Sequence, residues 1–336
     1  MTMPAAEEMA GPIAGEQTVG APARRKPLLA RIPDIAPLAV LLIGLCIFFA
    51  IKSEFFLEYD NFLNILTAAA ITGIIAAPAT LLLVAGQFDL SVGSGLTFAG
   101  IVMAYVAERQ GLLAGVLCAV AAGLLLGAIN GTLVTVVGVN PLITTLGTLA
   151  AFVGLARVIA DGQTLPLNDF SGLGTSRPLF DIPLPVIIFA VVVIVFAGVM
   201  RYTVFGRSMY AIGANPVAAR LAGIRTKRLI FAAFVLSGLC VALAALINVS
   251  QLSAASTQAG NGLELSVITA VVLGGASLSG GRGTMLGTLF GLLVIAVLNN
   301  GLTLLSVNSF WQDVARGTLL ILAVSFDQLR LRFADR

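Results

Sequence analysis

The sequence predicts an all-α, polytopic membrane protein of about ten transmembrane helices. First, 58% of its 336 residues are hydrophobic and only 10% are charged, with a mean hydropathy of +1.03, whereas soluble domains carry about 25% charged residues. Second, apolar runs recur at about the 20 residues that a helix needs to cross a hydrocarbon core about 30 Å thick. Third, positive charge gathers in alternate connecting segments, as is typical of membrane proteins.

The chain divides into a polar tail, a membrane domain and a short basic end. Residues 1–33 are rich in Ala, Gly, Pro and Glu, so we expect a disordered cytoplasmic tail there. Residues 34–326 form the predicted membrane domain, and residues 327–336 form a second cytoplasmic tail. Within the membrane domain, helices are expected near 34–51, 62–85, 90–107, 111–137, 142–160, 183–200, 229–249, 264–280, 284–305 and 310–326. The segments 142–160 and 264–280 are short and rich in Gly and Thr.

The distribution of basic residues predicts the orientation. If the N-terminus is cytoplasmic, fourteen Arg and Lys residues fall in cytoplasmic segments. Only Lys52, Arg109 and Arg177 then fall in outer segments. This bias predicts that both termini are cytoplasmic.

The largest cytoplasmic segment, 201–228, carries six Arg or Lys residues and no Asp or Glu. Within it, Asn215 is a good N-cap, Pro216 suits the first helical position, and Gly223 is a fitting C-terminal stop. On the resulting short helix, Val217 and Leu221 would be neighbours one turn apart. One interpretation is a loop whose charges only set the orientation. A capped helix is not needed for orientation, so we favour a helix that docks into a groove on another protein.

Four motifs in order resemble the permease subunit of ribose-type sugar ABC importers, a family related to branched-chain amino-acid permeases. They are GQFDLSVGSG (86–95), NPLITTLGT (140–148), TVFGRSMYAIGANPVAARLAGI (203–224) and ELSVITAVVLGGASLSGGRGTMLGT (264–288). Gln87 and Phe88 depart from the family's first motif, and Ser266 and Thr269 depart from its last, with Ser266 standing where Asp is usual. The stretches 86–95 and 274–283 also share Gly residues around a Leu-Ser pair, which suggests a duplication with broken, Gly-rich helices.

The resemblance implies a type II-importer-like permease of the bacterial inner membrane, built as a homodimer or pseudo-dimer in the lipid bilayer. Its implied partners are a cytoplasmic ATP-binding cassette ATPase and a periplasmic sugar-binding protein, with no role for nucleic acid. Residues 201–228 would then be the ATPase-coupling loop, with Pro216–Ala222 as its docking helix. The residues carried over from the matched motif are Arg207, Asn215, Ala218, Ala219, Arg220 and Gly223.

The chain itself has no means of hydrolysing ATP. A phosphate-binding Walker A loop needs Gly-Lys-Ser/Thr, and none of the three lysines, Lys26, Lys52 and Lys227, follows a glycine. The chain contains no His, and no cofactor or metal is expected. An ion-coupled transporter is the less favoured alternative, because no predicted span has a carboxylate near its centre. A branched-chain amino-acid permease is the closer alternative.

Polar residues within the apolar spans are candidates for the translocation pathway. Asp89 lies in a Gly-rich break, where we expect it to cap a helix or to accept bonds from free backbone N–H groups rather than to contact substrate. A neutral sugar needs hydrogen-bonding groups and an apolar wall; Phe310 and Trp311 could supply the wall. The other pathway candidates are Asn130, Thr144, Thr145, Asn248, Asn299 and Asn300. Each could instead bond between helices, and we expect no dedicated high-affinity pocket.

Overall fold

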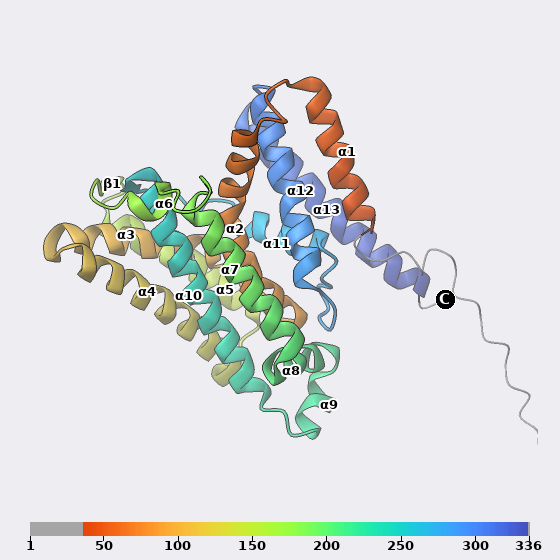
Figure 1. Ribbon diagram of the computed structural model, residues 1–336. Coiled ribbons are helices and arrows are strands. Elements are labelled where there is room, and N and C mark those ends of the chain that lie inside the picture. Colours follow the sequence, from red (N-terminus) through yellow and green to blue (C-terminus); the bar gives the residue numbers. More distant parts are fainter. Residues whose placement is uncertain (1–35, 335–336) are drawn as a thin grey trace, which may run out of the picture. The chain divides into compact units, whose positions relative to one another are not determined.

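The computed structural model describes residues 36–334, so the expected tail at 1–33 lies outside the described residues. The described part is almost entirely helical (Figure 1), which confirms the all-α prediction. The helices are α1 (Ala36–Lys52), α2 (Tyr59–Val84), α3 (Val92–Gln110), α4 (Leu112–Thr132) with its π-helical continuation η2 (Leu133–Val137), α5 (Pro141–Ile159), α6 (Gly172–Thr175), α7 (Leu184–Tyr202), α8 (Val204–Ala214), α9 (Pro216–Leu221), α10 (Thr226–Leu252), α11 (Leu263–Leu273), α12 (Met285–Leu304) and α13 (Ser309–Ala334). Two short strands, β1 (Leu165–Pro166) and β2 (Ala254–Ala255), pair in antiparallel register.

The expectation of about ten spans needs correction. Among the described residues, six helices are long and apolar enough to cross a membrane: α2, α4 with η2, α5, α7, α10 and α12. The apolar helices α1 and α11 are shorter, and α3 ends in the polar run Glu108–Gln110. The segment predicted as 264–280 is helical only to Leu273, because Gly275 follows with a left-handed φ of +85°. At the other end, α13 continues to Ala334, beyond the expected end of the membrane domain.

Helix α10 lies at the centre of the packing, against α2, α3 and α4. Its contact with α4 depends on small residues: Gly123 and Gly238 lie backbone to backbone, and Gly127 lies against the carbonyl of Phe234. Small residues let helices in a membrane approach closely and gain dispersion contacts, since burial between helices brings little hydrophobic gain there. Helices α4 and α10 therefore form the most closely packed pair of the bundle.

Two non-helical segments interrupt the bundle, and both lie near the start of α3. Residues 85–91 join α2 to α3, and residues 253–262 join α10 to α11. The second segment packs against the first turns of α3, where the Gly260 N–H donates to Thr97 Oγ1 at 3.0 Å. Irregular backbone is tolerated within a membrane protein where protein groups pair its N–H and C=O groups.

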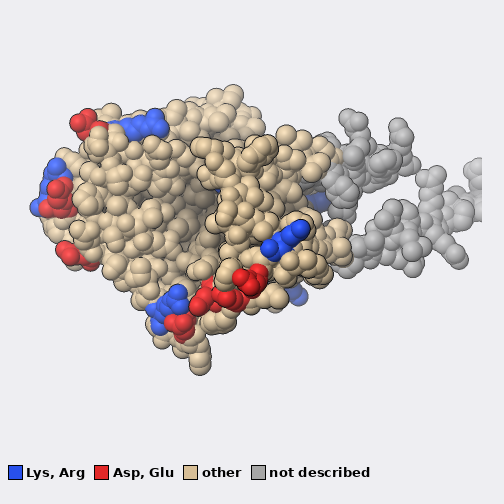
Figure 2. All heavy atoms as spheres, turned by 90° about the horizontal axis from the view of Figure 1, so that it is seen from above, with Lys and Arg blue, Asp and Glu red and all other residues tan. Residues whose placement is uncertain are grey.

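The two ends of the bundle differ in charge. Helices α8 and α9, in the basic segment 201–228, lie at the end opposite the α1–α2 turn (Figure 1). Seen from the side of that turn, acidic and basic side chains form small mixed groups near the edge, and most of the face is uncharged (Figure 2).

Candidate functional sites

Helix α9 has the two caps that its sequence predicts. The Asn215 side-chain oxygen accepts hydrogen bonds from the N–H groups of Val217 (3.0 Å) and Ala218 (2.9 Å). At the other end, Gly223 has φ +81°, and the N–H of Ile224 donates to the carbonyl of Ala219 at 3.0 Å. This is the Schellman arrangement, which pairs carbonyls that a helix end leaves free. Local signals alone therefore specify this short helix.

The exposed side of α9 is apolar with cations beside it. Val217 is 61% exposed and Leu221 is 85% exposed, although both are large apolar side chains. Ala218 and Arg220 are exposed as well. We call these four residues the docking surface. In contrast, Ala219 is only 5% exposed and belongs to the hydrophobic core, so it supports α9 from beneath and does not face a partner.

The remaining residues carried over from the motif shape this region. Arg207 lies on α8, which the sequence did not predict as a helix, and it donates to the Tyr202 carbonyl at 3.3 Å. Asn215 and Gly223 begin and end α9. An exposed apolar pair on a capped helix is the kind of surface that another protein buries.

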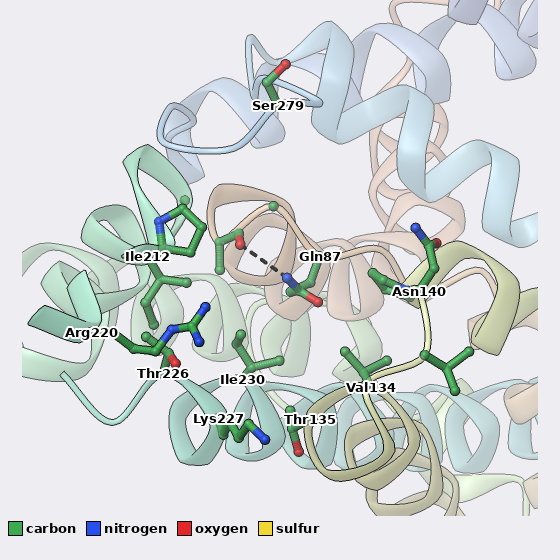
Figure 3. A pocket seen from close by; sticks show the side chains of 17 residues that line it. Gln87, Val134, Thr135, Asn140, Ile212, Arg220, Thr226, Lys227, Ile230 and Ser279 are labelled. Atoms are coloured by element: carbon green, nitrogen blue, oxygen red, sulfur yellow. Dashed lines mark hydrogen bonds between the residues drawn. The ribbon is translucent and has the colours of Figure 1, made fainter. Parts of the chain in front are cut away.

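A cavity of about 460 Å³ opens beneath α9 (Figure 3). Arg220 and Lys227 both contribute to its wall, together with Gln87, Thr135 and Ser279 from three other segments. No Asp or Glu belongs to this lining within the described chain. The lining of the cavity therefore combines the basic segment 201–228 with residues of the two Gly-rich stretches, 86–95 and 274–283.

Helix α8 directly touches the end of α2 and the Gly-rich stretch 274–283. The Val84 carbonyl, at the end of α2, accepts a hydrogen bond from the Gly281 N–H at 2.8 Å. Gly213 of α8 lies so close to this pair that a Cβ atom there would overlap the Val84 carbonyl. The Tyr210 hydroxyl donates to the Gly283 carbonyl at 2.7 Å, and burial raises the pKa of Tyr210, so the hydroxyl keeps its proton. We call these five residues the backbone junction.

Asp89 makes hydrogen bonds on both carboxylate oxygens. One oxygen accepts from the N–H (3.1 Å) and the hydroxyl (2.6 Å) of Ser91, and the other accepts from the Ser237 hydroxyl of α10 (3.0 Å). This geometry supports the expected structural role for Asp89, since the carboxylate pairs a backbone N–H at the start of α3.

The polar chain continues from Ser91 into two further helices. Asn130 of α4 donates to the Ser91 hydroxyl oxygen at 2.7 Å and accepts from the Thr148 hydroxyl of α5 at 2.8 Å. Thr145 donates to the Pro141 carbonyl within its own helix, and the buried Thr144 hydroxyl has no partner among the described residues. Asn130 therefore bonds between helices, which was its alternative to a pathway role, and Asp89 bonds the segment 85–91 to α10.

Asn299 and Asn300 lie elsewhere, in a second cavity of about 470 Å³ between α2, α11, α12 and α13. We call it the polar cavity. Six of its lining residues carry amide or guanidinium groups: Asn64, Asn261, Asn299, Asn300, Gln312 and Arg316. Four of these were not among the pathway candidates. They come from separate helices and a loop, so no local motif could have grouped them.

No metal centre is visible in the part of the chain that the structure describes, where no three His, Cys, Asp or Glu side chains gather. The polar cavity instead offers neutral amides and one guanidinium, which suit hydrogen bonding to a small organic molecule.

Comparison with known proteins gives consistent matches along the chain. The family described as "Branched-chain amino acid transport system / permease component" matches residues 61–324. The ribose import permease protein RbsC of Bacillus subtilis is 41% identical over 293 residues, covering 84% of this chain and 89% of its own length. The D-allose transport system permease protein AlsC of Escherichia coli is 35% identical over 293 residues, covering 86% and 90%.

A third relative is the probable ABC transporter permease protein y4mJ of Sinorhizobium fredii, which is 38% identical over 275 residues, or 81% of this chain and 82% of its own length. No solved structure matches the chain. The family match covers well over half of the sequence and includes both cavities, the docking surface and the backbone junction. The chain therefore belongs to the branched-chain amino acid transport system / permease component family.

Proposed function

We propose that this chain is the transmembrane subunit of an ATP-binding cassette importer that carries a monosaccharide or a related polyol. A separate cytoplasmic ATPase hydrolyses ATP, and a periplasmic binding protein delivers the sugar. The chain works as a dimer in the bacterial inner membrane, with both termini in the cytoplasm. The excess of basic residues in the segments assigned to the cytoplasm supports this orientation.

The docking surface is the observation that carries the proposal. It exposes Val217 and Leu221 on a helix held by caps at both ends, with Arg220 beside them. Its neighbour α8 touches the end of α2 and the loop before α12 through the backbone junction. A force applied at α9 by another protein would therefore reach the end of α2 and the loop before α12, a connection that a loop which only sets orientation does not need.

Sugar is favoured over a branched-chain amino acid as the cargo. The relatives named above include a ribose permease and an allose permease. The polar cavity also contains no Asp or Glu in its described lining that could neutralise an amino acid's ammonium group.

The test is uptake into proteoliposomes that contain this chain, its cognate ATPase and its cognate binding protein. We expect ATP-dependent uptake of D-ribose or D-allose, and no uptake by the chain alone under a proton or sodium gradient. Leu221→Ser should weaken binding of the ATPase by about tenfold or more, seen as reduced co-purification, since burial of a leucine stabilises by about 1.5–3 kcal/mol. Leu179→Ser makes the same change on an exposed leucine of the 161–183 segment, and it should leave the ATPase bound.

Either of two results would contradict the proposal. One is uptake by the chain alone that depends on an ion gradient. The other is normal ATPase association in Leu221→Ser combined with normal association in Arg220→Glu, whose charge reversal turns attraction into repulsion at an interface.

A further inference from the structure

Unpaired polar atoms are concentrated in one place in this molecule. Among the side chains that the structure describes, five buried nitrogen or oxygen atoms have no hydrogen-bond partner. Three of them, Asn299 Oδ1, Asn300 Oδ1 and Arg316 Nε, belong to residues that line the polar cavity. Buried polar groups are almost always paired in folded proteins, because leaving them unpaired is unfavourable. A cluster of exceptions around one cavity indicates that something inside the cavity pairs them.

Hydrogen bonds within the protein fix the direction of two of these side chains, Asn300 and Arg316. The Asn300 side-chain N–H donates to Asn61 Oδ1 at 2.8 Å, so its oxygen is left over. Arg316 donates from Nη1 to the Ser266 hydroxyl at 3.2 Å and pairs through Nη2 with Asp313 at 3.1 Å. Its Nε is the one guanidinium nitrogen that is buried without a partner.

The free atoms are two acceptors and one donor. A hydroxyl group both donates and accepts, so neighbouring hydroxyls on one small molecule can satisfy all three atoms. The cavity volume of about 470 Å³ lies within the range of about 300–1,000 Å³ for small-molecule sites. Leu263, Leu292 and Ile295 supply an apolar wall for the carbon-bound face of a sugar ring.

Charge argues against an ionised ligand. Arg316 is the one charged residue in the described lining, and Asp313 already pairs with it. A carboxylate ligand could accept from Arg316, but it has no hydrogen to donate and would leave both asparagine oxygens unpaired. An ammonium group would find acceptors but no counter-charge, which is costly away from water.

We propose that the polar cavity is a binding site within the permease for a neutral, polyhydroxylated ligand, in which Arg316 donates to the ligand while Asn299 and Asn300 accept from it. This inference rests on the proposed function and assigns a substrate site to the permease itself. From the sequence we expect no dedicated high-affinity pocket, and this site needs only to bind sugar at millimolar concentrations. Arg316 becomes a specificity-determining residue.

The experiment measures binding to the purified, full-length chain in lipid nanodiscs, without ATPase or binding protein. D-ribose, D-allose and L-leucine are titrated to millimolar concentrations and followed by saturation-transfer NMR. We expect saturable binding of at least one sugar and none of leucine. Arg316→Met and Asn299→Leu should each weaken sugar binding by about tenfold or more, because a hydroxyl loses its partner.

Arg177→Met is the matched control. Arg177 also pairs with a nearby aspartate, Asp181, on an exposed part of the chain outside the cavity. This variant should bind sugar as the unmodified chain does, and size-exclusion profiles of all variants check their folding.

The unmodified chain provides the decisive result, because it cannot fail through misfolding. If it binds neither sugar, while the complete complex still imports one with ATP, the site assignment is wrong and the proposed function stands. Leucine binding, or sugar binding that both cavity variants retain in full, also overturns the site. Sugar binding by the chain, with no ATP-dependent uptake by the complex, would support the site and contradict the proposed function.

Discussion

The docking surface and the polar cavity are built in opposite ways. The docking helix is encoded in nine consecutive residues, Asn215–Gly223, whose caps and exposed side chains follow from their order. The cavity takes its polar groups from α2, α11, α12, α13 and the segment 253–262. The first can be deduced from a sequence window, whereas the second exists only after the bundle packs. The difference shows why a partner-binding element was easier to predict here than a ligand site.

The backbone junction lies between α8, which precedes the docking helix, and α2, which lines the polar cavity. The substitution Gly213→Ala is expected to disrupt it most strongly. The added Cβ would overlap the Val84 carbonyl, which is backbone and cannot move aside as a flexible side chain could. We expect a loss of roughly 1–3 kcal/mol of stability or more, together with loss of ATP-dependent uptake.

Gly198→Ala is the control, because a Cβ at Gly198 of α7 meets no atom within 4 Å. Thermal unfolding in detergent and proteoliposome uptake are compared for the two variants. Equal melting temperatures and equal uptake would show that the junction does not matter.

Asp89 tests whether the polar chain is structural. Asp89→Leu leaves the Ser91 N–H and the Ser237 hydroxyl without their partner, a loss of roughly 1–3 kcal/mol for each unpaired group. Asp89→Asn keeps one acceptor oxygen, so it should lose clearly less stability and less uptake. The measurement is thermal unfolding alongside uptake. Complete loss of uptake in both variants, with normal unfolding, would indicate a required charge instead.

The smallest effect is expected at the cap of the docking helix. Asn215→Ala removes the acceptor for two backbone N–H groups, which typically costs about 1 kcal/mol and frays the first turn. Faster hydrogen exchange at Val217 and Ala218 should report this, with a modest decrease in coupled ATPase activity. Asn215→Asp keeps the cap and should exchange as the unmodified chain does. Unchanged exchange in Asn215→Ala would mean that packing alone holds α9.

The sequence predicted the helices better than their roles. All ten apolar segments contain helix, because hydrophobicity and length are local properties, but α11 stops at Leu273 where positive-φ glycines begin. The sequence did not predict α8, because its basic and polar residues interrupt the apolar pattern to which the buried Met209 and Ile212 belong. The burial of Ala219 likewise depends on α8 and α10 packing against α9, which no window of sequence contains.

Only the three-dimensional structure divides the candidate pathway residues into two groups. Asp89 and Asn130 were predicted with Asn299 and Asn300 because all are polar residues near apolar runs. The structure places the first pair in a satisfied hydrogen-bonded chain and the second beside a cavity with unpaired atoms. Whether a polar side chain finds a hydrogen-bond partner depends on residues that are distant in the sequence, so composition could not distinguish the two groups.

Helix α2 connects the backbone junction to the polar cavity. It runs from Asn61 and Asn64, beside the cavity, to Val84 at the junction. At 1.5 Å per residue, its 26 residues make a rod of about 39 Å. Gly213 and Gly281 contact the Val84 end of α2 through backbone atoms, which cannot rotate away as a flexible side chain can. A displacement of α8 would therefore be passed on to α2. If α2 moved as one body about its Val84 end, a tilt of about 5° would displace its other end by roughly 3 Å, enough to break the hydrogen bonds that would hold a sugar in the proposed site.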